Sequence, residues 1–483
     1  MHLVYKYKAV GVKMKITIRN LARITEANVE LKPLTVFIGK NNTNKSYVAH
    51  VFYALFDMVK KNLGSFFSFS EKKEIVDRFN IFFKKEKISG HFLYSLKKEK
   101  KVLQKLLSLF NTIWQRTFPD YIKNPHLNTT IEIDESELLN HIFEEMDCRL
   151  ILYDEKDTAE VFVSTSSFRK RNVYLGLSRL KENEKGILAD FLVNIVQGLI
   201  GSYFKVSYPF FYFPAARTGF SLALDDIRSG AFEKYSGMPI TRLSKPTIDF
   251  IKQYDDIKHE RLLFNPGGQS KEVKEILLFF EKQLLDGKIL LETNSIENYI
   301  LRKFVYRPRG FKDTPLEFHC VSSMVTELAP IYSVLKVLGD IKDTFLIIEE
   351  PEAHLHPYAQ LEIVKLLGML VRKGARVLIT THSDYILNFI NILIRSSQLS
   401  DEERKKLNFR RKKQDLSQCF LKPEEVRCYF FKEKKKEVEL KNIEITEHGI
   451  DTETFEEVLD EIVGISEKID NILFQRIKSN VSK

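Results

Sequence analysis

One stretch near the N-terminus, "TVFIGKNNTNKSYVAHVFYAL" (residues 35–55), constrains the fold more than any other part of the chain. It begins with a short apolar run that is typical of a buried strand. The next segment, Gly39–Ser46, matches the phosphate-binding pattern G-x-x-x-x-G-K-[ST] except that Asn44 replaces the second glycine. Apolar residues then recur at helical spacing. This order predicts an α/β protein with a nucleotide-binding loop; the alternative is a polar loop that carries Lys-Ser by chance.

Each part of this loop has a predicted role. Lys45 would reach the β- and γ-phosphates, and the Ser46 hydroxyl would bind Mg²⁺. Asparagine tolerates left-handed backbone angles, so Asn44 permits a glycine-like turn, but its side chain would crowd the phosphates and weaken binding or slow turnover. We predict ATP contacts for these residues: Gly39, Asn41, Asn42, Thr43, Asn44, Lys45 and Ser46.

Two later segments, "TFLIIEEPEAHLHP" and "ARVLITTHS", read as buried strands that end in polar residues. Because α/β sheets bind ligands at the carboxyl ends of their strands, Glu349 is a candidate Mg²⁺ ligand and Glu350 a candidate general base. His382 follows the second strand and could contact a γ-phosphate or position water. The alternatives are that the carboxylates only cap a strand and that the histidine is structural.

Two further candidates are weaker. Ser322 and Ser323 begin a predicted helix and could offer hydroxyls and backbone N–H groups to an anion, or could simply cap the helix. Arg217 follows the strand in "FYFPAARTGF" and could bind a phosphate or form a structural ion pair.

The coarse pattern predicts strands that alternate with helices and hence a mainly parallel sheet. Two strands are expected at 298–308 and 315–321, a helix that Gly374 closes, and a helix from Thr454. We expect one main α/β domain that two insertions interrupt. The predicted regions are 1–60 (first part of the main domain, with the phosphate loop), 61–205 (mainly helical insertion), 206–225 (return to the main domain), 226–294 (second helical insertion), 295–440 (rest of the main domain) and 441–483 (tail).

Composition narrows the function classes. The four cysteines form no CxxC pair, which suits a reducing cytoplasm and argues against structural zinc. The sequence contains no run of 18 apolar residues, so we expect no membrane span. A net charge of +10 permits a polyanionic partner. The basic segment Arg404–Lys413 could bind DNA phosphates or could be a solvated loop.

Together these motifs resemble the ATP-binding-cassette (ABC) ATPases of the SMC/RecF/OLD type. The resemblance rests on five segments in the family's order: Walker A (Gly39–Ser46), signature helix (Val321–Glu327), Walker B (Phe345–Glu350), D-loop (Pro351–Pro357) and switch histidine (His382). It implies an ABC-ATPase head, an α/β fold with a mixed and parallel sheet, flanking helices and large, mainly helical insertions. It also implies ATP and Mg²⁺ as ligands.

The resemblance further implies homodimers or higher homo-oligomers that hold ATP between heads, with Ser322 meeting the γ-phosphate of the partner's nucleotide. Glu349 takes the magnesium role, Glu350 that of the catalytic base and His382 that of the switch residue. Asn44 and the glycine-poor "SSMV" depart from the family pattern and imply slow hydrolysis.

OLD-type nucleases carry a TOPRIM domain with an Asp-x-Asp motif, which does not follow His382, so we expect no nuclease in this chain. The remaining resemblance is to stand-alone prokaryotic AAA/ABC ATPases of anti-phage defence. These imply a sensor or scaffold for DNA or a phage protein, with a separate nuclease or toxin as effector. Two alternatives stay open: a DNA repair or recombination ATPase, and a nucleotide-bound assembly scaffold that does not hydrolyse ATP.

Overall fold

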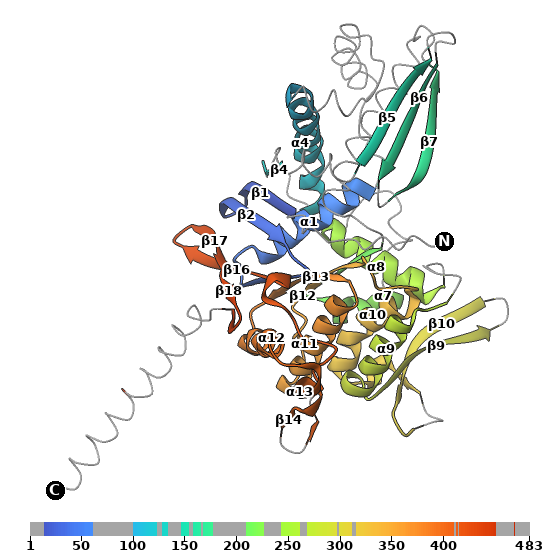
Figure 1. Ribbon diagram of the computed structural model, residues 1–483. Helices are drawn as coiled ribbons and strands as arrows, with labels where there is room; N and C mark the ends of the chain where they lie inside the picture. The colour runs from blue at the N-terminus through green and yellow to red at the C-terminus, as the bar shows by residue number, and fades with distance from the viewer. Residues whose placement is uncertain are drawn as a thin grey trace, which may run out of the picture.

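The computed structural model is shown in Figure 1. It describes residues 14–60, 100–122, 128–133, 146–153, 158–165, 168–176, 209–226, 243–260, 268–296, 299–311, 315–409, 412–413, 415–450 and 468.

A six-stranded sheet forms the centre of the described structure. In sheet order its strands are β17 (Glu437–Ile443), β16 (Val426–Lys434), β3 (Leu34–Gly39), β13 (Arg376–Thr381), β12 (Phe345–Glu349) and β8 (Phe210–Phe213). All neighbours pair in parallel except β17, which runs antiparallel to β16. This confirms the predicted α/β class and mainly parallel sheet. The carboxyl ends of β3, β12 and β13 therefore meet at one edge.

Helices cover the central sheet and bury its strands. Helix α1 (Lys45–Lys60) contacts β3, β12 and β13, and α11 (Pro357–Arg372) contacts β13 and α12 (Asp384–Ser396). Figure 1 shows α1 on one side of the sheet and α11 and α12 on the other. Every residue of β3, β8 and β12 is buried, which explains why these strands are almost continuous apolar runs in the sequence.

The helix-boundary predictions are confirmed in two places. Helix α10 (Ser323–Val337) begins at the predicted serines, with Ser322 as its N-cap. Helix α11 ends at Arg372, and Gly374 follows with a φ of 91°, the left-handed conformation that a glycine at a helix end supplies. Two other helices are α7 (Arg217–Asp226) and α13 (Asp401–Lys406).

A second, antiparallel sheet is built from β1 (Met14–Leu21), β2 (Ile24–Leu31) and β4 (Thr130–Ile133), in the order β2-β1-β4. Strands β1 and β2 are consecutive in the sequence and form a hairpin. Strand β4 comes from the 61–205 insertion, so the insertion is attached to the N-terminal sheet.

The 61–205 insertion differs from the mainly helical prediction. Its described part contains α4 (Lys100–Ile122), but also an antiparallel sheet of β5 (Met146–Tyr153), β6 (Thr158–Thr165) and β7 (Phe168–Gly176). The prediction did not include these strands because strand pairing depends on cross-strand neighbours, which a local pattern does not display. Figure 1 shows them projecting away from the central sheet.

The second insertion and the following hairpin need smaller corrections. Helices α8 (Lys245–Lys258) and α9 (Lys271–Phe279), with the π-turn η3 (Phe280–Leu284), agree with the helical prediction. Strand β9 (Gly287–Ile296) starts before the expected boundary and pairs with β10 (Tyr299–Pro308). The strand expected at 315–321 is wrong beyond its start: β11 covers Leu316–Glu317, and the 3-10 turn η4 (Phe318–Cys320) then leads the chain into α10.

At the C-terminal end, β17 crosses the predicted boundary at 440. The short pairs β14 (Asn408–Phe409) with β15 (Lys412–Lys413) and β18 (Ile445–Thr446) with β19 (Gly449–Ile450) are antiparallel, and the 3-10 turn η5 (Pro423–Glu425) precedes β16. The helix expected from Thr454 lies outside the described residues. None of the described helices is both long and apolar enough to cross a membrane.

Candidate functional site

The loop between β3 and α1 adopts left-handed backbone angles at two asparagines. The φ angle is 61° at Asn42 and 67° at Asn44, so Asn44 does adopt the glycine-like conformation that the sequence allowed. Gly39 has a φ of 152°, and a Cβ there would lie 2.7 Å from the carbonyl oxygen of Phe431. Asn41 and Asn42 are exposed, and Thr43 is buried with its hydroxyl donating to the Lys40 carbonyl at 2.7 Å.

The side chain of Asn44 leaves one polar atom without a partner. Its Oδ1 is buried and accepts no hydrogen bond within the described structure. A buried, unsatisfied carbonyl oxygen is destabilising by about 1–3 kcal/mol. It also places the negative end of a dipole in a loop that is predicted to bind phosphates.

The ammonium group of Lys45 is hydrogen-bonded to the backbone of the loop. Its Nζ donates to the carbonyl oxygens of Gly39 and Lys40, both at 2.7 Å, and the residue is only 7% exposed. Burial lowers the pKa of Lys45, and the negative charge of Glu350 opposes that shift most strongly. The loop lysine therefore lies within the electrostatic field of the carboxylates at the end of β12.

The predicted carboxylates and His382 meet at the same edge of the sheet. The Nδ1 of His382 lies 3.6 Å from Oε1 of Glu350. Glu350 has a φ of 44°, a left-handed angle that is uncommon for a residue with a side chain, and its N–H donates to the Thr380 carbonyl at 2.8 Å. About a third of the Glu350 side chain is exposed, so it is open to a ligand.

Glu352 is a site residue that the sequence reasoning missed. Its Oε1 accepts hydrogen bonds from the Thr381 hydroxyl at 2.5 Å and from the His382 N–H at 3.2 Å. Burial raises the pKa of the Glu352 carboxyl, while the Thr381 hydrogen bond opposes the shift. Glu352 therefore fixes the backbone that carries His382. Its place two residues after Glu350 was the available signal.

Glu349 is buried and lies near His50, a second site residue that the sequence analysis did not predict. Its Oε2 accepts from the Ala215 N–H at 3.3 Å, its Oε1 has no hydrogen-bond partner in the described structure, and His50 Nε2 lies 4.0 Å from that oxygen. The same His50 nitrogen is 2.8 Å from the Tyr212 hydroxyl, and burial lowers the pKa of His50. His50 is four residues after Ser46, on the same face of α1, and that spacing was the signal for it.

The side-chain oxygens of Glu349 and Ser46 are of the chemical type that binds a magnesium ion. Oxygen ligands suit Mg²⁺, which usually takes one or two carboxylates and keeps several waters. The unpartnered Oε1 of Glu349 is a buried acceptor of the required type, and Ser46 supplies a half-buried residue in the first turn of α1. Among the described residues, no group of three or more His, Cys, Asp or Glu side chains forms a protein-only metal cage.

Arg217 does not have the phosphate-binding role that was considered for it. Its side chain is fully buried, and Nη2 pairs with Oε1 of Glu327 at 2.5 Å. Burial lowers the pKa of Arg217, and the charge of Glu327 opposes that shift. The guanidinium also donates to the backbone carbonyls of Pro214, Glu327, Glu349 and Glu350. Because its nitrogens are occupied and lie away from solvent, the structural ion pair is the correct interpretation.

Ser322 and Ser323 are exposed at the first turn of α10. The Ser322 hydroxyl makes no capping hydrogen bond, although the residue occupies the N-cap position. Its side chain is therefore available to a ligand or partner.

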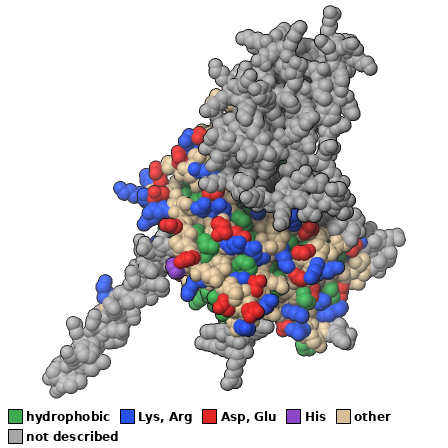
Figure 2. Space-filling model, viewed as in Figure 1, with side chains coloured by type: hydrophobic (Ala, Val, Ile, Leu, Met, Phe, Trp, Pro, Cys, Tyr) green, Lys and Arg blue, Asp and Glu red, His purple; other side chains and the backbone are tan. Residues whose placement is uncertain are grey.

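The basic segment 404–413 begins with a structural residue. Arg404 is buried, pairs with Asp401 at 2.5 Å, donates to the Ser396 carbonyl at 3.0 Å and lies over the Phe420 ring. Residues 410 and 411 lie outside the described part of the chain. Figure 2 shows basic and acidic side chains interspersed over the described part of the surface that it draws.

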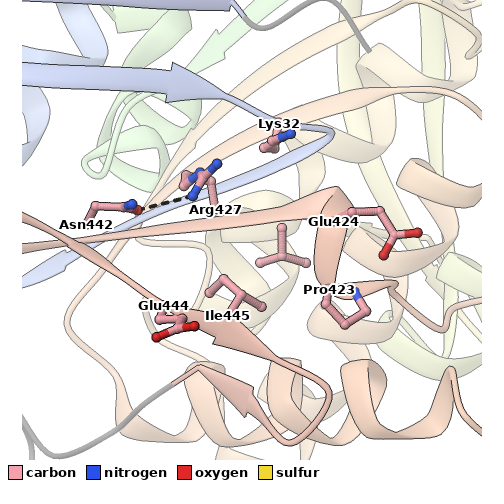
Figure 3. A pocket seen from close by; sticks show the side chains of 8 residues that line it. Lys32, Pro423, Glu424, Arg427, Asn442, Glu444 and Ile445 are labelled. Atoms are coloured by element: carbon pink, nitrogen blue, oxygen red, sulfur yellow. Dashed lines mark hydrogen bonds between the residues drawn. The ribbon is translucent and has the colours of Figure 1, made fainter. Parts of the chain in front are cut away.

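A pocket of about 650 Å³ lies at the opposite edge of the sheet from the loop (Figure 3). It is lined by the amino-terminal end of β16 and by Lys32, which precedes β3. Arg427 donates to Glu30 at 2.6 Å and to Asn442 at 3.5 Å, so its positive charge is already paired with a carboxylate. This pocket is separate from the candidate nucleotide site.

Comparison with known proteins gives one family match. A family model described as "AAA domain, putative AbiEii toxin, Type IV TA system" matches residues 34–388. That range contains Lys45, Glu349, Glu350 and His382. No curated protein matches the chain.

Several solved structures are similar to the chain at low identity. An Smc head bound to the C-terminal winged-helix domain of ScpA is 10% identical, with a TM-score of 0.34, and the match covers 90% of this chain and 98% of that one. An Smc head with an extended coiled coil, bound to the C-terminal domain of ScpA from Pyrococcus furiosus, is 9% identical, with a TM-score of 0.34 and coverages of 93% and 99%. An SMC head domain from Thermotoga maritima is 9% identical, with a TM-score of 0.31 and coverages of 90% and 99%.

Proposed function

This chain belongs to the AAA-domain family of the putative AbiEii toxin of type IV TA systems, and from that premise we propose that it is a slow, Mg²⁺-dependent ATPase. One observation carries the proposal. Lys45, Glu350 and His382 come from three distant parts of the sequence, and the fold brings them to one edge of a parallel sheet. Glu350 lies 3.6 Å from His382 and is the strongest opposing charge on Lys45.

In this proposal the loop holds the triphosphate. Backbone N–H groups of 39–46 surround the phosphate oxygens, and Lys45 exchanges its two carbonyl acceptors for the β- and γ-phosphates. Glu349 and Ser46 would hold Mg²⁺, which would neutralise the charge on the phosphates.

Glu350 is the group that accepts the proton from the attacking water. Its side chain is partly exposed, while the backbone on either side is held by hydrogen bonds, so the carboxylate has a fixed base and an accessible end. The His382 N–H donates to Glu352, and the His382 ring lies beside the Glu350 carboxylate, where it would also meet the γ-phosphate of a bound nucleotide.

The exposed first turn of α10 supports a nucleotide-gated homodimer. Ser322 has no capping bond to lose when it meets a ligand. In a head-to-head dimer it would contact the γ-phosphate held by the partner subunit, so that ATP joins the two heads and hydrolysis releases them. The dimer would act as a sensor or scaffold, and a separate effector, a nuclease or toxin, would act in anti-phage defence. The family description names a putative toxin in a toxin–antitoxin system, which is consistent with a defence setting.

A second candidate is a nucleotide-bound scaffold that does not turn over. The observation that favours it is the unpartnered Oδ1 of Asn44, because a partial negative charge in the phosphate loop opposes the charge that develops in the transition state.

Phosphate release by purified protein separates the two. We expect wild type to release phosphate from Mg-ATP and Glu350→Gln to release at least tenfold less while still binding ATP. Glu424→Gln is the matched control, because Glu424 is an exposed glutamate at the other edge of the sheet. Equal rates in wild type and Glu350→Gln, with ATP bound by both, would leave the scaffold as the function. Absence of ATP binding in wild type would end both proposals.

The defence role has its own test. Cells that carry the gene with its natural neighbours should resist phage, and Lys45→Ala in the same background should remove that resistance. Resistance that persists in the variant would separate defence from nucleotide binding.

A further inference from the structure

We propose that Arg217 is a positioning residue that links the first turns of α10 to the backbone of Glu349 and Glu350. The inference rests on the proposed ATPase function and deepens it. Arg217 touches neither nucleotide nor water, since its side chain is fully buried. Its effect on hydrolysis is therefore exerted through the residues that it holds.

The contacts of the guanidinium define this link. Nη1 donates to the Glu349 carbonyl at 2.6 Å and to the Pro214 carbonyl at 3.0 Å, and Nη2 donates to the Glu350 carbonyl at 3.0 Å. Nε donates to the Glu327 carbonyl at 3.2 Å. One rigid planar group thus connects the end of β8, the end of β12 and helix α10.

The carboxylate of Glu327 completes the connection. It pairs with Arg217 at 2.5 Å and accepts a hydrogen bond from the Thr218 hydroxyl, and it is fully buried. Glu327 lies little more than one helical turn after Ser322, whose carbonyl accepts from the N–H groups of Val325 and Thr326. A displacement of the exposed serines therefore moves Glu327, and with it Arg217.

Glu350 is the residue most sensitive to such a displacement. Its φ of 44° is an uncommon conformation that persists only when the surrounding structure holds it. The Glu350 carbonyl accepts from Arg217 and from the Ala353 N–H, both at 3.0 Å, and the Glu350 N–H donates to the Thr380 carbonyl. Without Arg217 the carbonyl keeps only the local bond from Ala353, and we expect the peptide after Glu350 to relax and the carboxylate to leave its place beside His382.

The link has a functional consequence. The serines of α10 are the part of this subunit that would meet a partner's nucleotide, and Arg217 carries their position to the base that acts on this subunit's own nucleotide. Engagement of one site would thereby set the geometry of the other.

The test uses a paired substitution, Arg217→Met/Glu327→Met. Exchanging both members of a buried ion pair for apolar residues is often neutral for stability, whereas removing one leaves an unpaired buried charge. The pair also removes the Arg217 donors to the Glu349 and Glu350 carbonyls, and it leaves the Ala353 N–H as a donor to the Glu350 carbonyl at 3.0 Å. We expect a melting temperature close to wild type, ATP affinity within threefold, and a kcat at least tenfold lower. The matched control is Arg372→Met/Glu425→Met, since that half-buried pair lies on α11 and η5, away from the site.

A double variant that folds and keeps the wild-type kcat would overturn the inference, because a merely structural role predicts that result. If the double variant does not fold, Arg217→Lys decides, since lysine keeps the charge but cannot reach all four carbonyls. A lowered kcat with retained ATP affinity supports the link, and an unchanged kcat removes it. If wild type and Glu350→Gln release phosphate equally, the proposed ATPase function has failed instead.

Discussion

Replacing Asn44 with glycine tests the reading of the phosphate loop most directly. Removing the side chain deletes a buried, unpartnered oxygen, which is worth about 1–3 kcal/mol, and removes the residual strain of a left-handed angle at a residue with a Cβ. Against this, glycine makes the unfolded chain more flexible, at roughly 0.4–1 kcal/mol. The folded state should gain roughly 0.5–2 kcal/mol on balance.

The chain contains a matched control for this substitution. Asn42 has almost the same backbone angle, 61° against 67°, but its side chain is exposed and leaves no buried atom unpaired. Asn42→Gly therefore shares the strain and chain-entropy changes without the gain from removing a buried oxygen. Asn44→Ala adds a third comparison, since it deletes the amide but keeps the Cβ in the left-handed conformation.

Calorimetry and isothermal titration with Mg-ATP measure the outcome. We expect Asn44→Gly to raise the melting temperature by roughly 1–4 °C and Asn42→Gly to leave it nearly unchanged. ATP affinity should rise about tenfold in Asn44→Gly, which corresponds to about 1.4 kcal/mol, and phosphate release should accelerate. Weaker ATP binding by Asn44→Gly, or equal effects of the two glycine variants, would show that the buried amide does not obstruct the phosphates.

Three further predictions concern the rest of the molecule. Gly39→Ala should abolish ATP binding measured by titration, because its Cβ would meet the backbone of β16 at 2.7 Å; binding at wild-type affinity would contradict this. Tyr121→Phe should lower the free energy of unfolding by about 1.5–3 kcal/mol, since the buried Asp57 carboxylate loses a hydrogen bond of 2.7 Å, and an unchanged urea midpoint would refute it. A maleimide at pH 7 should label the exposed Cys320 and leave Cys428 unmodified; burial raises the pKa of Cys428 to about 12, so above pH 9 the unfolded thiol ionises first and stability should fall as the pH rises.

The sequence was informative where local pattern and position in the sheet coincide. An apolar run that ends in Glu349 and Glu350 is typical of a strand buried on both faces, and in an α/β sheet the carboxyl end of such a strand lies at the ligand edge. The serines before α10 and the glycine after α11 marked helix ends for the same reason, since capping is a local requirement.

The rest of the site depends on contacts between distant segments. Arg217 follows a strand and precedes a helix, which suits a phosphate ligand equally well, and its burial is decided by Glu327, 110 residues later. His50 became part of the site because α1 turns it toward Glu349 and Tyr212. Neither partner can be identified from the neighbouring sequence, because such pairings depend on the assembled sheet.

The strand order has a consequence for how the protein is made. Strand β3 lies between β13 and β16, so neither of its neighbours exists until residues 376–381 and 426–434 have been synthesised. At ribosomal speeds of about 5–20 residues per second, this strand waits on the order of tens of seconds for its partners. The segment "LTVFIG" is apolar except for Thr35, and during that interval the nascent chain should depend on a chaperone to keep it from aggregating.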